Sequence, residues 1–241
     1  NGIEGAERGY LLADSGPIVP TTLPNGEPSN QIGLTAVRPL WGVDTLIEAL
    51  PMGADRISSD FGEVNAVVSE LFPDDRLSIS MFERDYNFTV AVYEGAFSIF
   101  DDPETSVRTG AGRTEIYRLA TEDLEALRLR LDELDNLAYY MPYYRNTNTS
   151  HCLTVTGLED VGNSELDFIA AFQDDPSEAT WTGTEIETDD GIVTYKDFIE
   201  TLLDESAPLQ SYYEGTCEGR YQVCALDCDA YDEAMCEAAV Q

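Results

Sequence analysis

The chain has 241 residues, 43% of them hydrophobic, which is enough for one large domain or two small ones that each bury a core. Its 47 acidic residues against 13 basic ones give a formal net charge of −34, and a nucleic-acid partner is excluded because the phosphate backbone would be repelled. No apolar run approaches the roughly 18 residues of a transmembrane span. Self-repulsion of this size predicts adaptation to salt, and cation binding is a second, compatible explanation.

The first 35 residues are rich in Gly, Pro, Asn and Thr and show neither helical nor strand periodicity. This composition predicts an extended N-terminal arm or tether over residues 1–35. We place a first α+β unit at residues 36–145. A second unit, of β-β-α type and with a cysteine-rich tail, is placed at residues 146–241.

Helical and strand periodicities alternate after the arm. Apolar spacing predicts a short helix at residues 43–50 and a second helix at residues 58–72. Alternating β-branched and aromatic residues predict strands at residues 77–83, 86–93, 96–100, 114–118 and 152–157. The clearest helix covers residues 121–137, with Thr121 as its cap, and a tyrosine-rich loop follows at residues 138–144.

The last third of the chain carries two strong local signals. Asp190-Gly191 between two short β-branched runs predicts a hairpin turn. Thr194 followed by Asp197 predicts a capping box at the start of a helix over residues 194–205. A further short helix is expected at residues 164–172.

Two stretches share one frame, DDPETSVRTG at residues 101–110 and DDPSEATWTG at residues 174–183. The same shift of 73 positions aligns Thr121 with Thr194 and the pair Tyr139-Tyr140 with Tyr212-Tyr213. We interpret this as two diverged β-β-α units, which predicts an α+β fold of antiparallel sheet segments with packed helices. Coincidence is the alternative, because DDP is also common turn chemistry.

The five cysteines are Cys152, Cys217, Cys224, Cys228 and Cys236. Their spacing lacks the C-x2-C pairs typical of zinc sites, so we expect disulfides that stabilise a C-terminal helix, with one odd cysteine. Disulfides predict an oxidising compartment, either extracellular or periplasmic in the cell envelope, reached through a signal segment that has been removed. The sequons at Asn87 and Asn148 fit such a compartment, although their use is open.

The stretch DDGIVTYKDFIETLL resembles the second half of an EF-hand, but the first loop position falls on Ile186, where a carboxylate is required. An irregular Ca²⁺ site remains as the alternative. Its candidate ligands are Glu187, Asp189, Asp190 and Asp197.

Catalytic motifs are absent from the sequence. The only histidine, His151, adjoins Cys152, and no G-x-S-x-G, Walker A, G-x-G-x-x-G or H-E-x-x-H pattern occurs. A carboxylate-based hydrolase remains open, because acid pairs are too abundant in this chain to be informative.

Clustered tyrosines supply a candidate contact surface, since they combine contact area with a polar tip. The cluster consists of Tyr139, Tyr140, Tyr143, Tyr144, Tyr212 and Tyr213. The alternative is that these residues belong to the core. The sequence therefore favours a non-catalytic, secreted or envelope-associated acidic module that binds a protein or glycan, assisted by calcium. A structural subunit that self-assembles through the arm or the odd cysteine is a further alternative.

Overall fold

The computed structural model describes residues 8–14, 19–29, 38–83, 85, 110–142 and 185–214, with the backbone alone for residues 110–117 and 187. Their centre is a four-stranded sheet in the order β1-β2-β3-β6, in which every neighbouring pair is parallel. The strands are β1 (Tyr10–Asp14), β2 (Arg76–Ser80), β3 (Leu137–Met141) and β6 (Tyr212–Tyr213). Because parallel neighbours need crossover connections, each strand pair here is joined through helical sequence.

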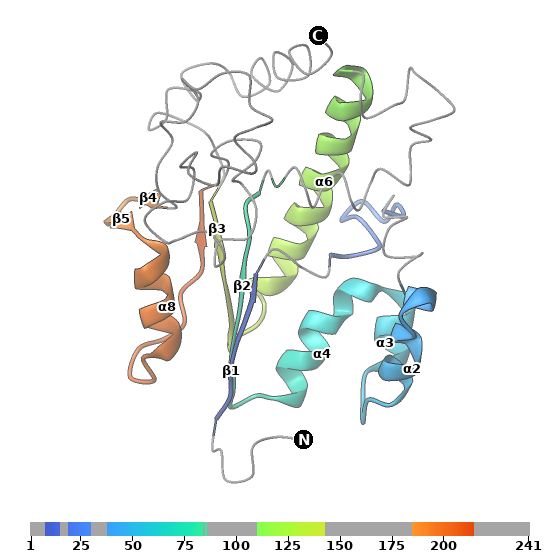
Figure 1. Ribbon diagram of the computed structural model, residues 1–241, viewed down its shortest axis with the longest axis horizontal. Coiled ribbons are helices and arrows are strands. Elements are labelled where there is room, and N and C mark those ends of the chain that lie inside the picture. The colour runs from blue at the N-terminus through green and yellow to red at the C-terminus, as the bar shows by residue number, and fades with distance from the viewer. Residues whose placement is uncertain are drawn as a thin grey trace, which may run out of the picture.

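Helices lie on both faces of this sheet (Figure 1). The long helix α6 (Gly110–Leu131) and α4 (Val64–Leu71) lie on one face, and α8 (Tyr195–Leu203) lies on the other. Two short helices, α2 (Val43–Glu48) and α3 (Ala54–Ser59), lie beyond α4, and the 3-10 turn η1 (Phe61–Glu63) joins α3 to α4. The arrangement is an α/β fold of three layers.

The two faces of the sheet bury different side chains because the side chains of a strand alternate. Leu77, Ile79 and Tyr139 pack with Leu127 and Leu131 of α6. The intervening positions face α8 and form a second core, which contains Phe82, Ala138, Tyr140, Ile186, Tyr195 and Phe198. Tyr140 lies at the middle of this aromatic group, 5.3 Å from the ring centroids of both Tyr195 and Phe198.

The local predictions for residues 186–203 are confirmed. Strands β4 (Ile186–Thr188) and β5 (Gly191–Val193) form an antiparallel hairpin. Gly191 has φ 128°, a value that side chains other than glycine rarely adopt. At the start of α8, the side chain of Thr194 accepts the amide of Asp197, and the Asp197 carboxylate accepts the amide of Thr194.

The predicted fold class is wrong, because the sheet is parallel and the helices cover both of its faces. The prediction assumed that strands close in sequence pair as hairpins. In the structure, β2 pairs with β1 and β3, which lie more than 55 residues away on either side. Strands so far apart in the sequence are not joined by a short turn motif, so the sequence does not show which strands pair.

The doubled β-β-α unit is also wrong in the residues that can be compared. Residues 114–118, predicted as a strand, belong to α6, and Thr121 lies inside that helix instead of capping it. Thr194, its supposed equivalent, is a true N-cap. Residues 138–141, predicted as part of a tyrosine loop, belong to the buried strand β3. What the two segments share is a helix followed by a strand with a tyrosine pair.

Part of the predicted arm belongs to the folded body. Residues 10–14 are strand β1, and residues 19–29 contact α6 through buried Val19, which shares a core cluster with Leu127, and through Ser29, which donates to Asp123. Gly62 permits this, since a Cβ there would lie 2.5 Å from the Cα of Pro20. The sheet therefore takes strands from residues 1–35, 36–145 and 146–241.

Several expectations fall on residues outside the described ranges. They are the five cysteines and their bridges, the sequons, both DDP segments, and the predicted elements at residues 86–93, 96–100, 152–157 and 164–172. Within the described ranges, none of the helices combines the length and apolar character that crossing a membrane would need.

Candidate functional site

The tyrosines singled out in the sequence do not form one exposed surface in the described residues. Tyr139 and Tyr140 are only 4% and 0% exposed, on opposite faces of β3, which favours the core alternative for these two. Tyr212 and Tyr213 are half-buried on the edge strand β6, and the guanidinium of Arg128 lies 4.8 Å from the Tyr213 ring centroid. Tyr143 and Tyr144 lie outside the described ranges.

The candidate calcium ligands are distributed around the β4–β5 hairpin and α8. Asp189 and Asp190 are exposed in the turn, whereas the Asp197 carboxylate is used by the capping box, which lowers its pKa. The side chain of Glu187 is not among the described ones. In the described residues, no three His, Cys, Asp or Glu side chains converge as a metal site would require.

A pocket of about 480 Å³ lies at the amino ends of β2 and β3. Three of its polar lining residues are already engaged in holding the fold. Asp75 accepts the amide of Gly9, Asp132 accepts the hydroxyl of Tyr139, and Asn136 donates to the carbonyl of Phe72. In parallel α/β sheets ligands bind at the opposite, carboxyl end. We therefore assign the residues that line this pocket a structural role, which is to fix the amino ends of β2 and β3.

The carboxyl end of the sheet contains a buried chain of hydroxyl groups. Tyr195 donates to Ser80 at 2.9 Å, and Ser80 donates to Asp14 at 3.0 Å. The chain joins β1, β2 and α8, and its two hydroxyl groups are closed to a substrate because Ser80 is 0% and Tyr195 is 1% exposed. The chain segments that follow each of the four strands lie largely outside the described ranges.

The surface at α2 is where large apolar side chains are most exposed in the described residues. Leu40, Trp41 and Leu46 are 78%, 71% and 68% exposed, the three highest values among the described large hydrophobic residues, and they fall within seven positions. Met52 is also exposed. We call Leu40, Trp41 and Leu46 the α2 surface. Tryptophan is the residue most enriched among the energetic centres of protein interfaces, so this exposure indicates a binding surface.

This surface rests on a firmly packed base. Ile47 on the inner side of α2 is 4% exposed and packs with Ile57, Phe61 and Val67. The three exposed residues thus adjoin a buried cluster that fixes the helix beneath them. A rigid, pre-ordered apolar residue loses little entropy when a partner covers it.

Residues 38–40 are helical, and Arg38 fixes the turn at residues 41–42 that separates them from α2. Its guanidinium lies 4.9 Å from the ring centroid of buried Phe61 and donates to Asp44 at 2.6 and 3.0 Å. Gly42, at the N-cap of α2, has φ 64° and allows the chain to reverse directly after Trp41. The Arg38–Asp44 ion pair therefore spans the turn that carries Trp41, whose side chain is 71% exposed.

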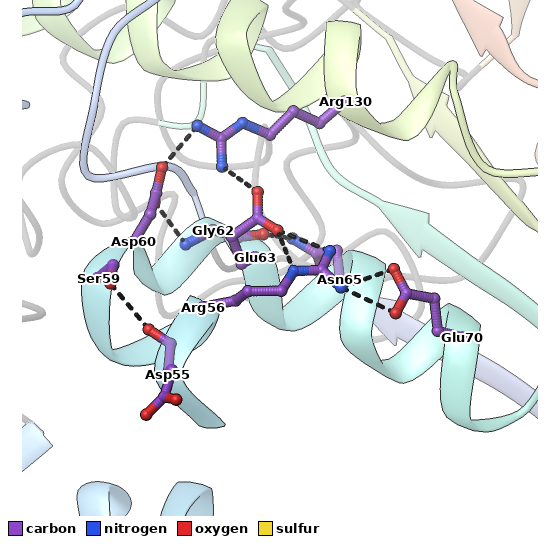
Figure 2. A network of polar contacts seen from close by, with 9 residues as sticks. All are labelled: Asp55, Arg56, Ser59, Asp60, Gly62, Glu63, Asn65, Glu70 and Arg130. Carbon is purple, nitrogen blue, oxygen red and sulfur yellow. Dashed lines mark hydrogen bonds and ion pairs between the residues drawn. The ribbon is translucent and has the colours of Figure 1, made fainter. Parts of the chain in front are cut away.

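A network of ion pairs links α3, η1 and α4, which lie under the α2 surface, to helix α6 (Figure 2). Arg130 of α6 donates to Asp60 at 2.6 Å and to Glu63 at 3.1 Å, and Arg56 of α3 bridges Glu63 and Glu70. Asp60 also accepts the amide of Gly62. Burial would raise the pKa of Asp60, but the amide of Thr21 and the guanidinium of Arg130 hold it below its ordinary value. The helices under the α2 surface are thus linked to α6.

The sequence carries a signal for this surface that our pattern analysis did not use. In residues 43–50 the buried stripe is Val43, Ile47 and Leu50, at helical spacing. Leu46 lies outside that stripe, and Trp41 lies in the turn before the helix. Apolar residues that do not fit the buried stripe of a short helix are candidates for contact with a partner.

Comparisons of this chain with protein-family models, curated proteins and solved structures found no match.

Proposed function

We propose that the chain is a non-catalytic acidic binding module that holds a partner protein on the α2 surface. The observation that carries the proposal is Trp41, which is 71% exposed although Arg38 before it and Ile47 after it are fixed on the buried cluster. An isolated tryptophan in water contributes nothing to stability, whereas one covered by a partner is a typical centre of binding energy. The buried cluster beneath α2 supports the same conclusion, since it holds the surface in one shape.

The proposal includes export of the protein to an extracellular or periplasmic location. This part of the proposal rests on the cysteine pattern, the sequons and the acidic composition. Calcium binding is retained as a separate proposal, independent of the α2 surface, with the acids of the β4–β5 turn as its ligands. Mass spectrometry of the thiols in protein purified without reductant tests the export, and five free thiols would contradict it.

The binding surface itself is tested with a photo-cross-linking residue in place of Leu46. The captured protein is identified, purified and titrated against the wild type and Trp41→Ala. We expect Trp41→Ala to weaken the complex at least about tenfold, because truncating a central aromatic costs more than about 1 kcal/mol.

Ile192→Ala is the matched control, since Ile192 is an exposed apolar residue on the distant β4–β5 hairpin. It should leave the affinity unchanged. Equal affinities of the wild type and Trp41→Ala for the purified partner would contradict the proposed function, as would equal losses in Trp41→Ala and Ile192→Ala.

A further inference from the structure

The chemistry of the partner can be deduced from the charges around the α2 surface, and this deduction rests on the function proposed above. Helical spacing of 3.6 residues per turn places Leu46 on one flank of α2 and the acids Asp44 and Glu48 on the other. The crest between the flanks carries the small residues Thr45 and Ala49, both exposed. A partner that covers the crest therefore meets Leu46 on one flank and carboxylates on the other.

Among the described residues, part of the negative charge at this place has no counter-charge. Arg38 is the only cation of residues 38–55, and it is already paired with Asp44. Glu48 and Asp55 are exposed and form no ion pair within the described part of the chain. Asp55 lies in the first turn of α3, which contacts α2, and its carboxylate points away from the ion-pair network in Figure 2.

We infer that the α2 surface binds a cationic amphipathic segment of another protein, whose apolar side chains cover Trp41 and Leu46 while its Lys or Arg side chains pair with Glu48 and Asp55. Charge complementarity excludes the other occupants. A second copy of this chain, with a net charge of −34, would be repelled, and so would an anionic lipid surface. A neutral apolar segment would leave the two carboxylates partly desolvated without a counter-charge.

The long-range field acts in the same direction. A net charge of −34 raises the local concentration of cationic partners and increases their association rate at low salt. That field alone does not choose a site, because acids cover much of the chain. Local contacts at α2 must therefore determine where the partner binds. For this reason the test removes the same charge from the α2 surface and from the β4–β5 turn.

The experiment uses the full chain with Trp181→Phe, so that Trp41 is the only tryptophan and its emission reports on the surface. Two synthetic amphipathic helical peptides are the probes. They have the same leucine positions, and their polar positions carry Lys in one peptide and Glu in the other. We expect the Lys peptide to shift the Trp41 emission and to bind at least about tenfold more tightly than the Glu peptide.

Glu48→Gln/Asp55→Asn should weaken binding of the Lys peptide about tenfold. The matched control is Asp189→Asn/Asp190→Asn, which removes the same charge from two exposed residues of the β4–β5 turn. It should change the affinity less than about twofold, because charges beyond a Debye length are screened. Added salt should weaken the complex.

The outcomes separate this inference from the proposed function. Equal binding of both peptides, or equal losses in the two double variants, overturns the cationic partner and leaves the α2 surface intact. No binding of the Lys peptide up to about millimolar concentration also overturns the inference. Full binding to Trp41→Ala, followed with a fluorophore on the peptide, shows that the peptide binds elsewhere and counts against both.

Discussion

The guanidinium of Arg38 lies over the ring of Phe61, 4.9 Å from its centroid, and the same group clamps Asp44 of α2. One side chain thus joins the loop that carries Trp41 to the buried cluster under α2. Phe61 is itself 4% exposed, so the position of this cation is set by the core.

Arg38→Gln should increase the mobility of the turn that carries Trp41, directly before α2. We expect a loss of about 1 kcal/mol in unfolding free energy, from the stacking contact and the ion pair. The anisotropy of Trp41 fluorescence in a Trp181→Phe background should fall. Arg118→Gln, which removes an exposed pair on α6, is the control. An unchanged anisotropy in Arg38→Gln would show that the loop is held by other contacts.

Asp60→Asn should cost about 2–3 kcal/mol, because the carboxylate accepts the amides of Thr21 and Gly62 and pairs with Arg130. Glu70→Gln makes the same charge change at the exposed end of the network and should cost less than about 1 kcal/mol. Urea unfolding followed by circular dichroism measures both. Equal losses would show that the network acts only through its total charge.

Acid should act through the same carboxylate. The pKa of Asp60 in the folded protein lies below its ordinary value of 3.8, so its contribution is complete above that pH and is lost as the pH falls further. The difference in unfolding free energy between the wild type and Asp60→Asn should therefore shrink from about pH 4 downward. A difference that grows on acidification would contradict this assignment.

Alkali should act through Tyr195, since burial raises its pKa to about 12. The folded state holds this proton more tightly than the unfolded state, so stability is complete below about pH 10 and falls between about pH 10 and pH 12. Tyr195→Phe should reduce the slope of unfolding free energy against pH by about 1.4 kcal/mol per pH unit in this range. Near pH 8 the same substitution should lower the unfolding free energy by about 1 kcal/mol, because the hydrogen bond to Ser80 is lost. Urea titrations across this range provide the measurement, and an unchanged slope would rule out Tyr195 as the group involved.

Arg76→Met should destabilise the end of α8. Arg76 is 9% exposed, and its guanidinium donates to the carbonyls of Thr201, Leu202 and Ala207. Removing it leaves carbonyls without a donor, and we expect a loss of about 3 kcal/mol with faster amide exchange at the end of α8. Lys196→Gln, which breaks an exposed pair on the same helix, should have little effect. Unchanged exchange in Arg76→Met would mean that water replaces the guanidinium.

Local structure was predictable wherever the determining residues are close in sequence. The capping box of Thr194 and Asp197, the turn at Gly191 and the apolar stripe of α4 each depend on residues a few positions apart. The buried strands were harder. Leu137–Met141 is buried on both faces and therefore shows no alternation, and we predicted a loop for most of it.

The polar residues of β2 also show that burial could not be predicted from the sequence. Ser78 and Ser80 suggest a solvent-facing side of the strand, yet both are buried because Ser78 donates to the carbonyl of Leu11 and Ser80 donates to Asp14. Their partners lie 66 or 67 positions away. A buried polar group is stable only when paired, and the pairing cannot be seen before the strands are placed.

The sequence alone determined the acidity of this protein, its caps and turns, and the helical stripes of α4 and of the second half of α6, because all of these follow from composition or from neighbours within one or two turns. Tertiary structure decided that the strands are parallel, that Tyr139 and Tyr140 are core residues, and that Trp41 remains exposed. Those three properties depend on which distant segments cover a side chain. Burial is a relation between parts of the chain far apart in sequence, and for that reason the α2 surface became visible only in the folded molecule.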